Sequence, residues 1–543
     1  MCGFVGYLGN RSLRELDKHF TKIQHRGPDK TEFEEFKNKL TLKSKARAVL
    51  WFHRLAINGL DEKSGQPMNL RKASLQRYWL ICNGEIYNHK TLSEKYNFKT
   101  ETNSDCEIII HMFAKFGMNR TCRELDGVFA LSLYDKKEGI LYSARDRYGV
   151  RPSFFGASSG EYFVASEIKA MSDIAEKIQH FPPGSWWSSE TPQSFYSYFD
   201  CDYKPDNNAS FEEATTQIQN LLTSAVEKRM MSDREIGCLL SGGLDSSLIA
   251  SLANSMTSER IKTFSIGMPG SPDVAYAQKV ADWIGSDHHV VETTAQEFVD
   301  AIEEVIYSIE SYDTTTVRAS VGNYLVGKYI KENTDVKVVF NGDGSDEVAM
   351  GYLYNINAPS NAAFFEENLK LLREIHIYDV LRSDRSVSSH GLEARTPFLD
   401  RDFVDYYMSL PVDLKRFGGE VPEKNLLRSA FSETGLLPLD VLNRTKCAFS
   451  DAVSTRENSW HKIIQQHVNT VVSDGEFAKH GSRLHPCTPV LKESYYYRKV
   501  FEKFFGKPAT LTIPKFWMPN WSDVNDPSAR ELTEYQEDEA TKT

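Results

Sequence analysis

The sequence predicts two domains of different class in succession, an α+β layered domain in about the first 195 residues and an α/β domain with a doubly wound parallel sheet after it. In the first part, short strand-like runs such as YWLICNGEIYN and VFALSLYD are broken by Gly and Asn and interleave with helical patterns such as SDCEIIIHMFAKF. In the second part, apolar strand candidates alternate with helices, as in IGCLL before SSLIASLANSM and IKTFSIGM before AYAQKVADWIG. Such alternation is typical of a parallel sheet with helices on both faces.

The boundaries between these units follow from composition. Between Phe195 and Ser210 the chain carries Pro, Asp and two Asn and has no sustained apolar period, so we expect the linker there. From Ser522 onward the chain is polar and acidic, which predicts a loosely held C-terminal tail. The predicted units are therefore residues 1–195, residues 210–521 and a tail, residues 522–543.

Composition and charge exclude several classes of protein. The 543 residues are 41% hydrophobic and 26% charged, as in ordinary globular proteins. Lys and Arg total 64 against 75 Asp and Glu, a net charge of −11 without any basic block, so we expect no nucleic-acid partner. No run of about 18 apolar residues and no signal-peptide pattern occurs, so we expect no membrane segment and a cytosolic location. The eight cysteines form no CxxC pair, which argues against a zinc ribbon or a thioredoxin-type centre.

Cys2 is the first candidate catalytic residue. Once Met1 is removed, a thiol nucleophile and an α-amino base belong to the same residue. The α-amino group has a pKa of about 7.7–8.0, so it can accept a proton near neutral pH. Gly3 then allows a substrate to approach the backbone closely.

Several further segments accompany Cys2 in the first 170 residues: HRGPD, FHRLAINGL, NGEIYNH with Asp105, LDGVFA and RDRYGVRP. Together they resemble the class II glutamine amidotransferases, which implies an N-terminal-nucleophile sandwich fold and hydrolysis of glutamine through a Cys2 thioester. By this resemblance Asn83 and Gly84 form the oxyanion hole. The resemblance also implies a glutamine site whose members are Arg54, Leu55, Ala56, Ile57, Asn58, Asn83, Gly84, Glu85 and Asp105.

The residue types in this set suit a free amino acid. The guanidinium of Arg54 matches an α-carboxylate, and the carboxylates of Glu85 and Asp105 can receive an α-ammonium group. An oxyanion is stabilised by a side-chain amide and a backbone N–H, which are the donors that Asn83 and Gly84 offer.

The motif SGGLDSS, residues 241–247, is the second strong signal. It follows the apolar strand candidate IGCLL and opens a helix, so its backbone N–H groups lie where they can bind a phosphate. Asp245 can hold a magnesium ion. The motif resembles the pyrophosphate loop of ATP pyrophosphatases, which cut ATP between the α and β phosphates.

Five later segments extend the resemblance to nearly the whole chain: FSIGMPGSPD, YDTTTVRAS, GDGSDE, GLEARTPFLD and KCAFSD. They look like the synthetase domain of the glutamine-hydrolysing asparagine synthetases. The resemblance implies that Mg-ATP and aspartate form β-aspartyl-AMP, which ammonia from glutamine then attacks after passing between the sites. It implies an ATP site made by Leu239, Ser241, Gly242, Gly243, Asp245, Ser246, Ile266, Asn341 and Gly342, pyrophosphate binding by Arg318 and Lys446, and a magnesium ion held by Asp245 and Asp346.

Two positions depart from the family pattern. Asn341 stands where the family has serine, and Asp343 stands where the family has the glutamate that assists adenylate formation and deprotonates ammonia. Aspartate keeps the carboxylate but is one methylene shorter, and a misplacement of about 1 Å can cost on the order of 10²-fold in rate. A related amidotransferase for another carboxylate acceptor, and a non-catalytic sensor, are the alternatives; retention of Cys2, Asn83 and Asp346 argues against the sensor.

A second glycine motif needs a different interpretation. Residues 322–329, GNYLVGKY, satisfy the GxxxxGK part of a phosphate-binding loop, but Tyr329 replaces the required Ser or Thr. The surrounding apolar residues have helical spacing, so we predict a helix there. Family members commonly pair, so the resemblance also implies a homodimer.

Overall fold

The computed structural model describes residues 1–37, 46–455 and 457–532. Its N-terminal part contains two antiparallel sheets. The first has the order β2 (Lys30–Lys37), β3 (Arg47–Arg54), β1 (Gly3–Gly9), β8 (Glu161–Ala165), β7 (Phe154–Ser158), β9 (Lys177–His180). The second has the order β11 (Phe195–Ser197), β10 (Ser185–Ser188), β6 (Ile140–Arg145), β5 (Gly127–Asp135), β4 (Tyr78–Ile86).

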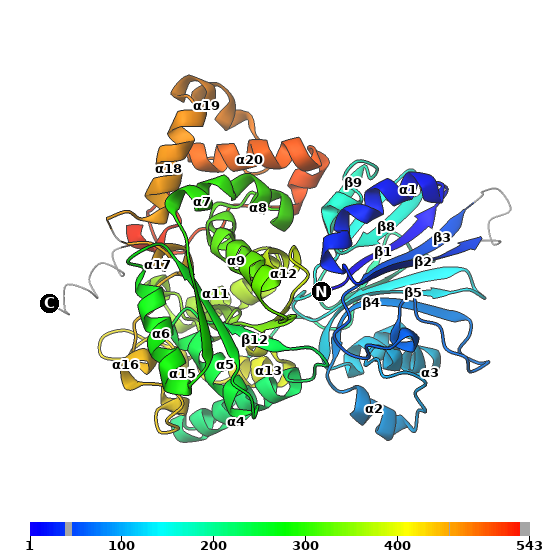
Figure 1. Ribbon diagram of the computed structural model, residues 1–543, viewed down its shortest axis with the longest axis horizontal. Helices are drawn as coiled ribbons and strands as arrows, with labels where there is room; N and C mark the ends of the chain where they lie inside the picture. The colour runs from blue at the N-terminus through cyan, green and yellow to red at the C-terminus, as the bar shows by residue number, and fades with distance from the viewer. Residues whose placement is uncertain (38–45, 456, 533–543) are drawn as a thin grey trace.

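The two sheets pack face to face because their strands alternate in side-chain direction. In β1, Phe4 joins Ile81 and Leu141 of the second sheet in the core between the sheets. The neighbouring Val5 points to the other face, where α1 (Leu13–Phe20) covers the first sheet with Phe20. Helices α2 (His89–Tyr96) and α3 (Glu107–Glu124) cover the second sheet from outside (Figure 1). This arrangement is the α+β sandwich that the sequence predicted.

The remaining chain is built on a five-stranded sheet whose neighbouring strands are all parallel. Its order is β14 (Asp287–Glu292), β13 (Lys262–Gly267), β12 (Ile236–Leu239), β15 (Val338–Phe340), β16 (Glu393–Arg395). The chain runs outward from β12 to β14 and then returns to β15, so the order reverses between β12 and β15. The predicted doubly wound sheet is therefore confirmed, and ligands bind at such a switch point, beyond the carboxyl ends of the strands.

Helices cover both faces of this parallel sheet. One face packs against α4 (Phe211–Arg229), α5 (Leu244–Ser255), α6 (Pro272–Ile284), α13 (Arg401–Ser409) and α15 (Asn425–Phe431). The other packs against α9 (Thr314–Asn333) and α12 (Asp379–Ser388), and α8 (Ile302–Ile309), α18 (Trp460–Val471) and α20 (Lys492–Phe505) extend the hydrophobic core of this side outward. The motif GNYLVGKY lies inside α9, which confirms the helix predicted for it.

The remaining α-helices of the described ranges are α7 (Ala295–Asp300), α10 (Ser345–Ala349), α11 (Asn361–Glu374), α14 (Val412–Lys415), α16 (Leu439–Leu442), α17 (Phe449–Ala452) and α19 (Asp474–His480), and short 3-10 helices connect some of the elements. None of the helices in the described ranges is both long and apolar enough to cross a membrane.

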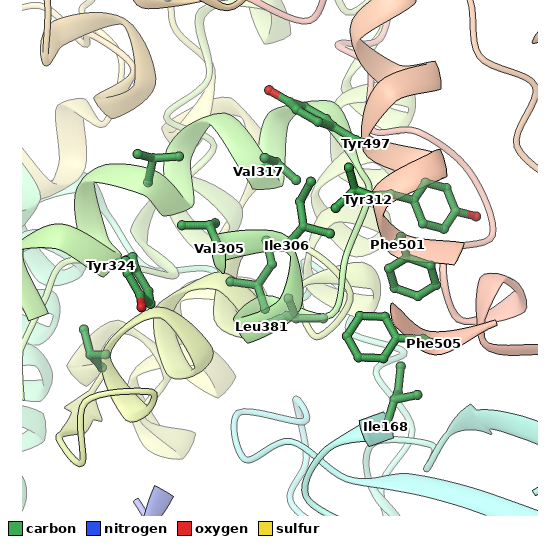
Figure 2. Packing of buried hydrophobic residues seen from close by; sticks show 14 of the residues in the cluster. Ile168, Val305, Ile306, Tyr312, Val317, Tyr324, Leu381, Tyr497, Phe501 and Phe505 are labelled. Atoms are coloured by element: carbon green, nitrogen blue, oxygen red, sulfur yellow. The ribbon is translucent and has the colours of Figure 1, made fainter. Parts of the chain in front are cut away.

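The two parts of the chain share a hydrophobic contact. Figure 2 shows Phe501 and Phe505 of α20 beside Tyr312, with Ile168 of the N-terminal part next to Phe505. A buried ion pair joins the same two parts, since Arg26 Nη2 lies 2.9 Å from Asp384 Oδ1 of α12. These contacts fix the position of the sandwich relative to the parallel sheet.

The expected tail is held more firmly than its composition predicts. Asp526 lies 2.6 Å from Arg318, the hydroxyl of Ser528 donates to Asp451 at 2.9 Å, and Arg530 donates to the carbonyl oxygen of Thr455 at 2.7 Å. Residues 522–532 are thus bound by an ion pair and by hydrogen bonds to residues distant in the sequence. The rest of the predicted tail, residues 533–543, lies outside the described residues.

Candidate active sites

Cys2 lies directly before β1 and faces the loop after β3. Its backbone N–H donates to Asn83 Oδ1 at 3.0 Å. Its Sγ lies 3.5 Å from the carbonyl oxygen of Leu55 and accepts from the Leu55 N–H at 3.4 Å. Burial raises the pKa of the Cys2 thiol to about 11, so this nucleophile needs a base close by.

The amino terminus is buried beside this thiol. The Met1 amino group donates to the carbonyl oxygen of Leu392 at 3.2 Å. Burial lowers the pKa of this Met1 amino group to about 6, so it is mostly neutral at pH 7. A neutral amine can accept a proton from a thiol.

Asn83 and Gly84 lie side by side on β4, opposite Cys2. The Asn83 Nδ2 group is buried, and nothing in the described ranges accepts a hydrogen bond from it. A Cβ atom on Gly84 would come within 2.1 Å of the Val128 carbonyl oxygen, so only glycine fits here. A buried N–H donor without an acceptor costs free energy unless a bound ligand accepts its hydrogen bond. The Asn83 Nδ2 group therefore suits an oxyanion hole.

Glu85 and Asp105 form a buried acidic pair at the same end of β4. Burial raises the pKa of Glu85 well above its ordinary value, and the charge of Asp105 raises it further. Burial also raises the pKa of Asp105, although its carboxylate accepts from the Ile86 N–H at 2.6 Å. Asn58 donates to Glu85. Two buried carboxyl groups of this kind are stabilised by an added cation, such as an α-ammonium group.

Arg54 ends β3 and begins the loop that contains the other predicted glutamine residues. Its guanidinium donates to the carbonyl oxygens of Gly59 and Asp61, at 3.2 Å for Asp61. The loop is held from both sides, because the Ala56 N–H donates to Asp29 at 2.9 Å and its carbonyl accepts from Arg234 at 2.9 Å. The sequence-predicted members Leu55, Ala56, Ile57 and Asn58 therefore lie on one fixed loop beside Cys2.

The SGGLDSS motif forms a tight loop between β12 and α5. Gly242 has a left-handed φ of 69°, and a Cβ there would lie 2.4 Å from the Ala277 backbone nitrogen. The hydroxyls of Ser241 and Ser246 are 2.9 Å apart, which closes the loop. Asp245 stands in the first turn of α5, where the hydroxyl of Ser345 donates to it at 2.8 Å.

A second loop, after β15, passes close to the first. A Cβ on Gly342 would lie 2.7 Å from the Ser246 backbone nitrogen, so glycine is required for this approach. Asn341 donates to the Ser383 hydroxyl at 2.6 Å, and Asp343 accepts from Arg382 at 2.9 Å.

The two loops line one cavity at the carboxyl ends of the parallel strands. Of the predicted residues, the cavity brings together Leu239, Ser241, Gly243, Asp245, Ser246, Ile266, Asn341, Gly342, Asp343, Asp346 and Lys446. Gly242 supports the loop from behind. The cavity lies at the switch point between β12 and β15, as the fold predicts for a ligand site.

Asp245 and Asp346 face each other in this cavity with a lysine ammonium group between them. Lys424 Nζ lies 2.7 Å from Asp245 Oδ2 and 2.6 Å from Asp346 Oδ1. Lys446 also pairs with Asp346. Burial raises the pKa of Asp346, but Lys424 and Lys446 outweigh that effect and hold this pKa below its ordinary value. The two carboxylates thus share a cationic group, as the oxygen ligands of magnesium share a metal ion.

Arg318 does not reach this cavity. Its guanidinium is buried in α9 and binds Glu493 at 2.6 Å and Asp526 at 2.6 Å, and both carboxylates come from the C-terminal segments. Arg318 is thus not among the residues that line this cavity in the described part of the chain, where two carboxylates compensate its buried charge, and its role in pyrophosphate binding stays a prediction.

The cavity wall also contains basic residues that the sequence analysis did not single out: Arg382, Lys424, Arg428 and Arg444. Arg382 belongs to the pattern YDVLRSDRS and Lys424 to PEKNLLRSAF, and neither pattern by itself marks a phosphate site. Only the packing of α12 and α15 against the sheet places them there.

Strand β16 connects the two sites. The Asn341 N–H donates to the Arg395 carbonyl at 3.1 Å, while Arg395 Nη2 lies 3.9 Å from Glu85 Oε1. One residue of β16 thus contacts the loop after β15 through its backbone and the acidic pair near Cys2 through its side chain.

The fold and the two sites define a glutamine amidotransferase domain joined to a synthetase domain. A family model described as a glutamine amidotransferase domain matches residues 1–228, and the asparagine synthase model matches residues 217–374 and 357–525. The chain belongs to the asparagine synthase family.

Similar proteins cover the chain from end to end. The asparagine synthetase [glutamine-hydrolyzing] of Cricetulus griseus is 40% identical over 569 residues, and that of Homo sapiens is 40% identical over 568 residues; each match covers 99% of both chains. A solved structure titled "Structure of the allosteric regulatory enzyme of purine biosynthesis" covers 54% of this chain and 80% of its own, at 15% identity and a TM-score of 0.33.

Proposed function

We propose that this chain is a glutamine-hydrolysing asparagine synthetase, a ligase that uses ATP to convert aspartate to asparagine with the amide nitrogen of glutamine. The observation that carries the proposal is the 40% identity to asparagine synthetases over 99% of both chains. The two sites described above support it, because each contains the residue types that its half-reaction requires.

In the glutaminase site, Cys2 acts after removal of Met1. Its α-amino group accepts the thiol proton, and the Leu55 N–H, 3.4 Å from Sγ, stabilises the thiolate. Sγ attacks the side-chain carbonyl of glutamine, and Asn83 Nδ2 and the Gly84 N–H bind the oxyanion. The Cys2 α-ammonium group returns its proton to the substrate nitrogen, ammonia leaves as the C–N bond breaks, and water hydrolyses the thioester to glutamate, which frees the Cys2 thiol. Glu85 and Asp105 hold the α-ammonium group of the substrate.

In the synthetase site, the SGGLDSS loop and Lys446 bind the phosphates of ATP. A carboxylate oxygen of aspartate attacks the α-phosphorus, which gives β-aspartyl-AMP and pyrophosphate. Ammonia then attacks the acyl carbon, AMP leaves, and Asp343 accepts the proton that the nitrogen loses. Leu239 and Ile266 pack against the nucleotide in this arrangement.

Asp245 and Asp346 fit a magnesium ion, because they are two facing carboxyl groups that already share a cationic group. When bound, magnesium neutralises charge on the phosphate oxygens. Magnesium binding, a homodimer and a cytosolic location remain predictions, as do the residue roles and the domain boundaries at 195, 210 and 521.

Product analysis tests the proposal directly. Purified protein is incubated with Mg-ATP, aspartate and glutamine labelled with ¹⁵N in the side-chain amide, and asparagine, AMP and pyrophosphate are measured. We expect labelled asparagine in equal amount to AMP. The matched control is Cys2→Ala, which should lose the transfer from glutamine but still use added ammonia. Glutamate without AMP would contradict the proposal and favour another carboxylate acceptor.

A further inference from the structure

Lys424 occupies the position of a cation between the two carboxylates of the synthetase cavity. Its Nζ lies 2.7 Å from each oxygen of Asp245 and 2.6 Å from Asp346 Oδ1. Lys424 is buried, so bulk water screens these contacts little. A single ammonium group therefore ties together the two side chains that fit a magnesium ion.

The backbone is shaped to hold Lys424 in this place. Lys424 has a left-handed φ of 56°, a conformation that residues with a side chain adopt rarely. A Cβ on Gly351 would come within 2.0 Å of Lys424 Cε and 2.1 Å of Asp346 Oδ1, so glycine leaves the space in which the two side chains meet. A side-chain-bearing residue held in the left-handed region at this contact points to a constraint imposed by function.

The charges in this cluster balance. Lys446 pairs with Asp346 and lies 3.8 Å from Asp245 Oδ2, so two ammonium groups face two carboxylates. A free divalent ion gains little electrostatic attraction from these two lysines and two aspartates, because their formal charges sum to zero. To bind, the ion must also displace Lys424 from both carboxylates. When a metal ion binds the two carboxylates in place of Lys424, the oxygen atoms of a bound polyphosphate can accept hydrogen bonds from the displaced ammonium group.

We propose that Lys424 excludes free divalent metal from Asp245 and Asp346 and moves to a phosphate oxygen when ATP binds, so that the metal enters this site as the metal–ATP complex. The proposal rests on the proposed function for the identity of the nucleotide. Lys424 is then a positioning residue that couples metal binding to nucleotide binding.

Mn²⁺ binding without nucleotide tests this step. Free Mn²⁺ is measured by its EPR signal in titrations of the wild-type protein, Lys424→Met and Lys415→Met. Lys415 is a matched control, because it is also buried but donates to the carbonyl oxygens of Tyr407 and Met408. We expect Lys424→Met to bind one Mn²⁺ at least about tenfold more tightly than the wild type, because a cation next to the metal position is removed. Lys415→Met should bind Mn²⁺ like the wild type.

Two further measurements make the result specific. Adding Asp346→Asn to Lys424→Met should abolish the gain, and ATP should tighten Mn²⁺ binding in the wild type more than in Lys424→Met. Equal Mn²⁺ affinity of wild type and Lys424→Met, or a gain that survives Asp346→Asn, would overturn the proposal. If Lys424→Met does not fold, as circular dichroism would reveal, Lys424→Gln replaces it in the same titrations.

No turnover is needed for these titrations. A protein that behaves as expected in Mn²⁺ binding but makes no asparagine therefore contradicts the proposed function and leaves the role of Lys424 intact.

Discussion

Replacing Asp343 by asparagine tests the residue at which this chain departs from its family. The amide keeps the shape of the carboxylate and can still accept the hydrogen bond from Arg382, which spans 2.9 Å in the wild type. Arg382 also retains its pair with Asp379 at 3.3 Å. We therefore expect the free energy of unfolding to fall by no more than about 1–2 kcal/mol, the difference between a charged and a neutral hydrogen bond.

The effect on synthesis should be much larger than the effect on stability. An amide cannot accept the proton released by the attacking ammonia, and loss of a positioned base costs about 10²–10⁴ in rate. Asparagine formation by Asp343→Asn should fall by this factor with either glutamine or ammonia as nitrogen source. Glutamine hydrolysis, measured as glutamate release, should be unchanged, because Cys2 and Asn83 lie in the other domain.

The control is Asp343→Glu, which restores the family's side chain and keeps the charge. It should retain more synthetase activity than Asp343→Asn. Both activities are measured on the same preparations, with asparagine and AMP determined by chromatography. Asparagine formation by Asp343→Asn at the wild-type rate, with ammonia as donor, would refute the assignment of Asp343 as the base.

Three further predictions concern other buried groups. Asn83→Ala should lower glutamine hydrolysis by about 10²–10³ because an oxyanion donor is lost, whereas ammonia-dependent synthesis should persist; a parallel loss in both assays would contradict this. Burial and Asp105 raise the pKa of Glu85, so Glu85 should become protonated at a pH above the ordinary carboxyl range and then bind the α-ammonium group of glutamine more weakly. We therefore expect kcat/KM for glutamine to fall on acidification in the wild type, and we expect this fall to be absent in Glu85→Gln. Burial lowers the pKa of Lys415 from 10.5 to about 7, so burying this side chain as an ammonium group destabilises the folded state fully below pH 7, and the destabilisation is lost as the pH rises to about 10.5. Lys415→Met should therefore unfold at a higher urea concentration than the wild type at pH 6, with a smaller difference at pH 9.

The sequence by itself determined the classes of both domains, and it singled out residues that the fold brings together around Cys2 and in the cavity of the parallel sheet. Alternating strand and helix patterns predicted the parallel sheet, because side-chain periodicity is set by each element's own geometry. The loop SGGLDSS and the neighbours Asn83 and Gly84 were identifiable because their residues are adjacent in the chain. The spacing around GNYLVGKY, which lies in α9, likewise predicted a helix rather than a phosphate loop.

The tertiary structure decided which charges meet. Lys424 lies 179 residues from Asp245 in the sequence, and Arg318 lies 208 residues from Asp526, yet each forms an ion pair with that partner. A buried charge requires a partner of opposite sign. Which of the many carboxylates supplies it depends on how α9, α15 and the C-terminal segment pack. That packing pairs Arg318 with Glu493 and Asp526, places Lys424 in the cavity wall, and binds residues 522–532, which the sequence predicted to be loosely held.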